Sequence, residues 1–248
     1  MKSPLLAVAL LVGAGPFPGD AMGPQEPRGG AAPAQEPAKE ADRFTKTFGE
    51  DARDFASTGS NPFFVLEPGY TLVLEGQDEG KEARITITVT AETQTIDGVE
   101  ARAVEEREEV GGKLIESTKD WFAISKRTNN VYYFGEDVDE YKDGKVVGHD
   151  GSWRSGVKGA HYGLLMMSTP QLGARYYQEL APGVGMDRAE VVSLSEMFEC
   201  PAGKFTDVLK TEETTPLEPK EKEHKLYARG VGLLYDGGLK LVRYGKGK

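Results

Sequence analysis

Arg84-Ile85-Thr86-Ile87-Thr88-Val89-Thr90 is the stretch that decides the fold. Apolar and threonine side chains alternate strictly along this segment, and successive side chains of a β-strand point to opposite faces of a sheet. The segment therefore predicts a strand with Ile85, Ile87 and Val89 on a buried face and the threonines on the other face.

Turn signals bound this strand and recur at short intervals along the chain. Asp97-Gly98 predicts a two-residue hairpin turn into 99–110, and Gly111-Gly112 predicts the next reversal. Residues that tolerate positive φ also mark turns at 76–80, 129–130, 143–144 and 236–238. The expected strands between these turns are 70–75, 84–90, 99–110, 131–136, 145–147, 227–235 and 239–244.

Helical signals are few. Residues 42–55 predict one short helix with Phe44, Phe48 and Phe55 near helical spacing, and 169–179 fits either a helix opened by Pro170 or a strand. The long crossover helices of a parallel α/β fold are missing. We therefore expect a mainly β fold with few short helices, in which an antiparallel meander of about ten strands curls into a barrel or half-barrel. A two-sheet sandwich is the alternative.

The N-terminal region predicts export. Met1 and Lys2 precede an apolar run at 5–12, which is shorter than the ~20 residues of a membrane-spanning helix. We interpret 1–22 as a signal peptide, 23–41 as a disordered Pro/Ala-rich linker, and 42–248 as a single β-rich domain. The expected location is secreted or periplasmic. No cysteine lies near the cleavage region to carry a lipid, and no transmembrane segment is expected.

Charge and cysteine content narrow the classes of partner. The 248-residue chain has a formal net charge of −10 and an isoelectric point near 5.0. Without a basic stripe to neutralise phosphates, nucleic acid and anionic membranes are disfavoured as partners. Cys200 is the only cysteine, so no internal disulfide forms. Its setting predicts a small buried side chain at a strand end rather than a nucleophile.

Aromatic side chains concentrate in 121–162, which holds both tryptophans and two of the three histidines. Such clusters are typical of binding surfaces. Alternation puts Val131 and Tyr133 on one sheet face and Tyr132 and Phe134 on the other, and only one of these faces needs to be core. The glycine-rich segment 156–170 predicts a loop across one mouth of the barrel, which covers a ligand or fills the core. The candidate ligand-binding residues are Trp121, Tyr133, Trp153 and Tyr162.

No spacing in the chain matches a known catalytic motif. The candidates for acid–base chemistry are Glu136, Asp150 and His161. Glu136 and Glu179 follow aromatic runs and resemble the carboxyl pair of a glycosidase, but a chain with 40 acidic residues contains such pairs by chance. A Gly-x-Ser-x-Gly elbow and a phosphate-binding loop are both missing from the sequence.

Metal ligands are equally sparse. The acidic hairpin 136–144 fails the EF-hand pattern, because Tyr141 falls on a ligand position and Gly144 comes too late. A looser cation site of Glu136, Asp137, Asp139 and Asp150 and a solvated hairpin tip both stay open. The histidines are too dispersed for zinc. We predict no metal and no cofactor.

Several short motifs occur along the chain between 61 and 235. They are Asn61-Pro62-Phe63-Phe64 with Leu66 and Pro68-Gly69, Asp120-Trp121, Asn130-Val131-Tyr132-Tyr133-Phe134-Gly135-Glu136, Gly151-Ser152-Trp153 and Tyr227-Ala228-Arg229-Gly230-Val231-Gly232. Through these motifs the chain resembles a group of secreted bacterial β-rich proteins, whose members commonly have Trp where this chain has Tyr132. The strand that ends at 227–232 also resembles the closing strands of envelope proteins with a half-barrel like that of lipocalins and lipoprotein carriers. The resemblance implies a curved sheet and an exported location, with no assigned chemistry.

These observations favour a non-catalytic function. An aromatic cluster without catalytic spacing predicts an exported protein that binds an apolar or amphipathic small molecule inside the curved sheet. A secreted hydrolase or lyase that uses Glu136, Asp150 or His161 is the alternative. A third hypothesis is a structural or interaction protein, for which we would expect a barrel filled with side chains and an exposed apolar patch elsewhere.

Overall fold

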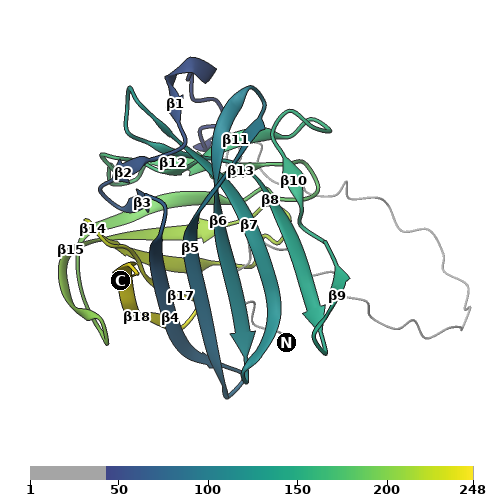
Figure 1. Ribbon diagram of the computed structural model, residues 1–248. Coiled ribbons are helices and arrows are strands. Elements are labelled where there is room, and N and C mark those ends of the chain that lie inside the picture. Colours follow the sequence, from purple (N-terminus) through teal and green to yellow (C-terminus); the bar gives the residue numbers. More distant parts are fainter. Residues whose placement is uncertain (1–42, 248) are drawn as a thin grey trace, which may run out of the picture.

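The computed structural model describes residues 43–247, which form almost entirely antiparallel β-structure (Figure 1). The predicted mainly β fold is confirmed. The expected signal peptide and linker lie outside the described residues and stay predictions. The helical content of the described chain is a short 3₁₀ turn, η2 (Ala52–Asp54). Within 43–247, no helix has the length and apolar character needed to cross a membrane.

A single 16-stranded sheet makes up the body of the protein. In spatial order its main strands are β12 (Arg175–Tyr177), β14 (Arg188–Cys200), β15 (Gly203–Thr214), β16 (Glu223–Ala228), β17 (Gly232–Asp236), β18 (Leu239–Lys246), β4 (Tyr70–Asp78), β5 (Lys81–Ile96), β6 (Val99–Val110), β7 (Lys113–Ser125), β8 (Val131–Lys142), β11 (His161–Met166) and β13 (Glu179–Leu180). Three short strands lie off this path and pair with strands inside it: β1 (Phe55–Ala56) pairs with β7, while β9 (Lys145–Gly148) and β10 (Trp153–Arg154) pair with β8.

The two ends of this strand order are neighbours in the chain, because only Gln178 separates β12 from β13. The segment 175–180 pairs with β14 through β12 and with β11 through β13. The sheet therefore curves round into a nearly closed barrel with one unsealed seam at Gln178. The barrel prediction is confirmed, and the sandwich alternative is wrong.

Tight turns with positive φ explain the order of the strands. Asp97 and Gly98 have φ values of 49° and 78°, and Asp143 and Gly144 have 53° and 75°. Two successive residues of positive φ match the twist of a hairpin, and for this reason Gly and Asp stand there. The expected strand 227–235 is wrong in one respect: a turn at 229–231 divides it into β16 and β17.

Two segments differ from the expectation. The helix expected at 42–55 is wrong within the described part of that range, because residues 44–51 are not helical, η2 is a single 3₁₀ turn, and Phe55 already begins β1. Phe48 and Phe55 pack on Tyr132 instead, with ring centroids 5.7 and 5.3 Å apart from its own. The segment expected to be a loop, 156–170, contains strand β11 at 161–166, which pairs with β8 in the barrel wall; the residues on either side of β11 are turns and irregular structure. In 169–179, the strand alternative is correct.

Both faces of β8 are buried, each for a different reason. Tyr132 and Phe134 point outward and pack with Phe55 and Tyr162 into a group that we call the outer aromatic cluster. The centroid of the Phe55 ring lies 5.3 Å from that of Tyr132 and 5.3 Å from that of Phe134. Tyr162 stacks on Phe134 with a centroid distance of 5.0 Å. Tyr133 points into the barrel. Cys200 is buried at the end of β14, as predicted.

A separate two-stranded hairpin closes one end of the barrel. It consists of β2 (Gly59–Asn61) and β3 (Phe64–Leu66), and we call it the end hairpin. On one side Asn61 donates through Nδ2 to the carbonyl oxygen of Asn129 at 2.8 Å. On the other side the Gly230 amide donates to the carbonyl oxygen of Pro62 at 2.7 Å. The end hairpin thus spans the barrel and presents Phe64 to its interior, where the ring packs against Phe122 at 5.2 Å.

Candidate binding cavity

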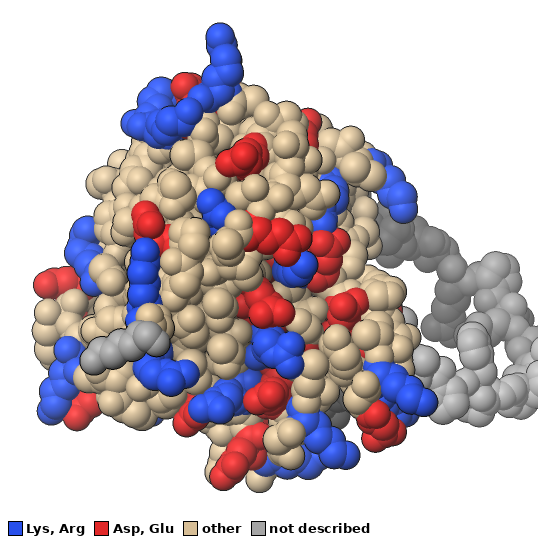
Figure 2. All heavy atoms as spheres, in the orientation of Figure 1, with Lys and Arg blue, Asp and Glu red and all other residues tan. Residues whose placement is uncertain are grey.

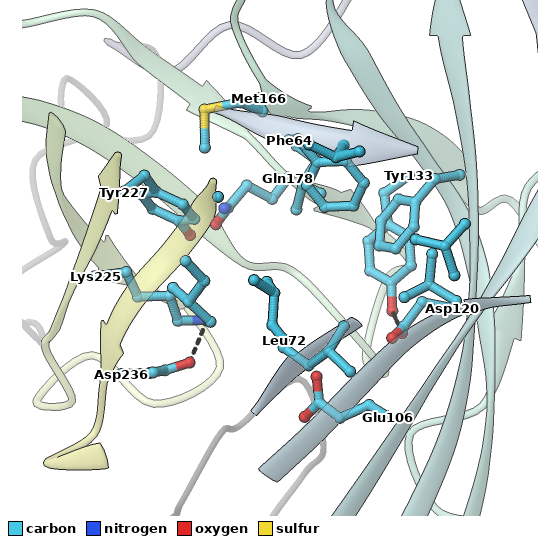
Figure 3. Close-up of a pocket in the computed structure, with 18 of the residues that line it drawn as sticks. Phe64, Leu72, Glu106, Asp120, Tyr133, Met166, Gln178, Lys225, Tyr227 and Asp236 are labelled. Carbon is cyan, nitrogen blue, oxygen red and sulfur yellow. Dashed lines mark hydrogen bonds and ion pairs between the residues drawn. The ribbon is translucent and has the colours of Figure 1, made fainter. Parts of the chain in front are cut away.

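The barrel interior contains a cavity of about 120 Å³ below the end hairpin (Figure 3). Strands from all round the barrel contribute to its wall. The apolar lining residues are Phe64, Val65, Leu72, Ile87, Val89, Val104, Phe122, Leu165, Met166, Val231 and Leu233. The polar ones are Tyr70, Glu106, Glu116, Thr118, Asp120, Tyr133, Gln178, Glu179, Asp187, Glu213, Lys225, Tyr227 and Asp236. The interior is therefore hollow rather than filled, and its wall is both apolar and acidic.

The two ends of the cavity differ in polarity. Figure 3 shows Phe64 and Met166 near the end hairpin, and Glu106 and Asp236 at the far side of the cavity, where Leu72 lies beside Glu106. The inward-facing residues change from apolar to acidic along single strands. On β7 the inward-facing residues run from Phe122 through Asp120 to Glu116, while Trp121 between them faces outward. The cavity is consequently amphipathic along the barrel axis.

Lys225 is the centre of one polar network. Its Nζ lies 3.1 Å from an oxygen of Glu213 and 3.5 Å from Oδ2 of Asp236. Burial acts to lower the pKa of Lys225, but these two carboxylates outweigh it and hold the pKa well above the usual value. Glu213 also accepts hydrogen bonds from Gln178 at 3.2 Å and from Thr211 at 3.1 Å. Lys225 is therefore charged and already engaged.

Asp120 forms a second polar group with Tyr133. The Tyr133 hydroxyl donates to Oδ1 of Asp120 at 2.5 Å. Burial raises the pKa of Asp120 to about 7, although the hydrogen bond from Tyr133 opposes the shift. Burial and the nearby Asp120 raise the pKa of Tyr133, so its hydroxyl keeps its proton. Asp120 is thus poised to change charge near neutral pH.

Two further carboxyl groups in the cavity have acceptors to spare. Neither oxygen of Asp236 has a hydrogen-bond partner within residues 43–247, although its side chain is fully buried. Burial raises its pKa to about 7 against the pull of Lys225. Glu106 points into the cavity and accepts no hydrogen bond from the described chain. Burial and the charges of Asp120 and Asp236 raise its pKa well above the ordinary value.

Behind Tyr133 lies a third acidic group, that of Glu136 and Glu179. Burial, and then the charge of Glu179, raise the pKa of Glu136 well above its usual range. Both carboxyl oxygens of Glu136 and the indole nitrogen of Trp153 lack partners among residues 43–247. Glu136 and Glu179, which the sequence analysis treated as a chance pair, therefore lie close enough to interact electrostatically. Glu179 lines the main cavity, whereas Glu136 does not and lies near Trp153 and Ala181.

The structure separates the four candidate ligand-binding residues. Tyr133 lines the cavity, and Trp153 packs edge-on against its ring at 5.4 Å. Trp121 faces outward, donates to Asp137 at 3.1 Å, and lies under the guanidinium of Arg154. Tyr162 belongs to the outer aromatic cluster. Only Tyr133 touches the cavity directly.

The structure also places the three candidate catalytic residues in different surroundings. Glu136 is buried, whereas Asp150 and His161 are exposed. In the acidic hairpin, Asp139 lies 2.8 Å from His149, and Asp137 pairs with Arg154. Within 43–247, no group of three or more His, Cys, Asp or Glu side chains is arranged to hold a metal ion. Glu136, Asp150 and His161 therefore do not form a common site.

The outer surface offers no competing feature on the face seen in Figure 2. Lysine and arginine side chains are interspersed with aspartate and glutamate over the strands of this face. Many of them pair locally, as Arg84 with Glu75 at 2.7 Å and Lys119 with Glu92 at 2.7 Å. On this face, therefore, charges of both signs are mixed.

Sequence reasoning missed most of the interior polar residues. Glu106, Asp187, Lys225 and Asp236 were not singled out, because acidic residues stand on both faces of several strands. In Glu105-Glu106-Arg107-Glu108-Glu109, alternation alone does not say which pair points inward. Val104 could have resolved this ambiguity. Because every second residue of a strand points to the same face, an inward-facing Val104 places Glu106 and Glu108 inside the barrel as well.

Comparisons with family models, with curated proteins and with solved structures gave no match to this chain. The class that the fold defines is therefore a nearly closed antiparallel β-barrel with an amphipathic internal cavity.

Proposed function

We propose that the protein is a non-catalytic, exported binder of a small amphipathic molecule, which it holds inside the barrel. The cavity beneath the end hairpin is the observation that carries this proposal. It has an apolar level formed by Phe64, Phe122 and Met166 and a polar level formed by Asp120 and Asp236. Ligand sites are typically concave and mostly apolar, with a few polar groups that fix orientation.

The volume of the cavity limits the ligand to a small molecule. An apolar cavity of ~150 Å³ in another protein admits benzene. At about 120 Å³, this cavity suits a molecule of a few carbon atoms with one polar group, or the end of a longer chain. Ile87 and Leu72 line the cavity, so the apolar part of the ligand can contact their side chains.

The proposed exported location rests on the sequence, namely the apolar run at 5–12 and the Pro/Ala-rich segment 23–41. The resemblance to secreted β-rich proteins and to half-barrel carriers supports the same location. Expression of the full chain with fractionation of cells and medium tests it, together with N-terminal sequencing of the mature protein. A chain that stays in the cytoplasm with Met1 intact contradicts export.

Direct binding measurements test the binding function. The purified full chain is screened by thermal shift and by tyrosine and tryptophan fluorescence against short-chain alcohols, amines, acids and esters. A ligand that binds only the folded state raises Tm, by an amount that grows with its concentration. A panel in which no compound changes Tm or emission contradicts the proposal.

A cavity-filling variant makes this test specific. Ile87 lines the cavity, and Thr88 beside it faces the opposite side of β5. Ile87→Trp should abolish the response to ligands, because the larger ring occupies their space, whereas Thr88→Trp should retain it. Equal responses of the two variants would place the ligand outside the cavity.

A second candidate function, a hydrolase or lyase, is favoured by one observation. Burial raises the pKa of both Glu136 and Glu179, and the charge of Glu179 adds to the shift of Glu136; buried carboxyl groups of this kind often serve as acid and base. A screen on glycans and esters, with Glu136→Ala and Glu179→Ala as variants beside Asp150→Ala and His161→Ala, tests it. Activity that none of these substitutions changes would exclude the mechanism.

A further inference from the structure

We propose that the ligand carries a positive charge, as a small organic amine whose ammonium group sits among Asp120, Glu106 and Asp236. This inference rests on the proposed binding function and names the chemical class of its ligand. It starts from the charge of the cavity wall, which holds seven carboxyl groups and a single amino group.

The single amino group is not available to an anionic ligand. Lys225 already contacts Glu213 at 3.1 Å and Asp236 at 3.5 Å. An incoming carboxylate would compete with two resident carboxylates for that ammonium, and it would also meet the other acidic side chains of the wall. Both effects disfavour an anion in the cavity.

Acceptor oxygens, by contrast, outnumber donors in this part of the cavity. The fully buried Asp236 accepts no hydrogen bond from residues 43–247, and its only partner there is Lys225, which is paired with Oδ2 at 3.5 Å. Glu106 faces the same space, and Asp120 uses one oxygen for the Tyr133 hydroxyl. The positive charge of a bound ammonium group lowers the raised pKa of Glu106 and Asp236, so that these carboxyl groups ionise on binding. The three donors of the ammonium group then form charge-assisted hydrogen bonds with their oxygens.

The geometry favours an organic cation over a metal ion. Residues 43–247 provide no group of three or more side chains arranged as metal ligands. The apolar level under the end hairpin, with Phe64 and Phe122, would leave a metal ion without ligands on that side. An alkyl chain attached to the ammonium fits there instead, because burial of its CH₂ groups against apolar side chains is favourable.

Three probes of equal chain length separate charge from shape. Calorimetric titration of the full chain at pH 7 compares n-butylamine, n-butanol and n-butyrate. We expect n-butylamine to bind at least about tenfold more tightly than n-butanol, since a hydrogen bond to a charged group contributes ~1.5–3 kcal/mol. Butyrate should not bind.

Charge-neutral variants locate the ammonium group. Asp236→Asn and, separately, Glu106→Gln should each reduce the affinity for n-butylamine by about tenfold or more and leave n-butanol binding unchanged. Asp143→Asn, at the exposed tip between β8 and β9, is the matched control and should change neither. Circular dichroism shows whether each variant folds, and Glu106→Gln keeps the test intact if Asp236→Asn does not.

The outcomes distinguish this inference from the proposed function. If n-butanol binds as tightly as n-butylamine, or if Asp236→Asn and Glu106→Gln do not alter the preference, the cation inference is overturned and the binding function stands. If no compound in the wider panel binds, both are overturned. Preferential binding of n-butyrate also overturns the cation inference.

Discussion

The two faces of β8 are equally buried, yet they are organised in opposite ways. On the outer face, Tyr132 and Phe134 are packed on all sides by rings, and the Tyr132 hydroxyl donates to Glu50 at 3.1 Å. On the inner face, Tyr133 stands beside Asp120, and Glu136 has two oxygens without partners in the described chain. Burial alone therefore does not identify a binding site. Polar groups left without partners distinguish the inner face.

The pH dependence of stability should show the largest difference between the two faces. Burial raises the pKa of Asp120 and of Asp236 to about 7, from 3.8 for an ordinary aspartate. Between these values the folded protein binds more protons than the unfolded chain, so its stability falls as the pH rises. The contribution is complete below about pH 4 and is lost by about pH 7, on the order of 4 kcal/mol for each of the two groups, at ~1.4 kcal/mol per pKa unit.

Thermal unfolding from pH 4 to pH 8 measures this effect, with Tm expected to fall across the interval. Asp120→Asn should make the decline shallower, while Asp143→Asn should leave it unchanged. A Tm that rises from pH 5 to pH 8 would show that the interior carboxyl groups are ionised and paired in the folded state.

Truncation of the outer aromatic cluster should have the next largest effect. Phe134 is fully buried against Phe55 and Tyr162. Phe134→Ala should lower the free energy of unfolding by about 3–5 kcal/mol, because it removes a buried ring and leaves a cavity. Urea denaturation provides the measurement, with Tyr244→Ala as the control, since Tyr244 is 44% exposed. Similar losses in both variants would mean that the cluster does not hold the outer face together.

Removal of a hydroxyl should cost more on the inner face than on the outer one. Tyr133→Phe leaves Asp120 without its donor and should cost about 1–3 kcal/mol. Tyr132→Phe should cost less, because Glu50 retains Ser125, Thr128 and Arg127 as partners. The two unfolding free energies, measured at the same pH, test the order. The reverse order would contradict our description of the two faces.

The smallest effect is expected for Glu136→Gln. Burial and the neighbouring Glu179 raise the pKa of Glu136, so the group is uncharged at neutral pH and glutamine is its neutral isostere. The free energy of unfolding should change by less than about 1 kcal/mol. Asp137→Asn on the opposite face should cost more, because Asp137 binds Trp121 and Arg154. A loss of several kcal/mol for Glu136→Gln would indicate an ionised, paired side chain.

Local sequence patterns predicted most of the strands and turns, but not how the ring closes. The alternation in 84–90 and the turn residues Asp97-Gly98 and Asp143-Gly144 determine structure over a few residues, and the structure contains these hairpins. The end hairpin and the segment 175–180 depend on contacts with distant residues such as Asn129 and Gly230, which no local pattern records. Phe44, Phe48 and Phe55 misled the helix prediction for a similar reason.

The candidate site was predictable only in part. Tyr133 could be found from its aromatic neighbours, whereas Asp236 follows a strand of apolar residues and reads as an ordinary turn aspartate. Its role depends on Lys225, which lies on the neighbouring strand and becomes its partner only when the two strands pair. The alternation of a sequence predicts which residues share a face of a strand, but it does not predict which face lines a cavity.

The closure of the barrel has a consequence for how the protein folds. Most neighbouring strands are joined by short connections and can pair early, and the segment 175–180 pairs with β11 and β14, which lie close to it in the chain. The junction of β4 with β18 is different, because it pairs Tyr70 with Lys246. Contacts so far apart in sequence form slowly. At the seam, Gly163 lies so close to the carbonyl oxygen of Gln178 that a methyl group has no room. Gly163→Ala would therefore push β11 away from the segment 175–180 and widen the seam of the barrel.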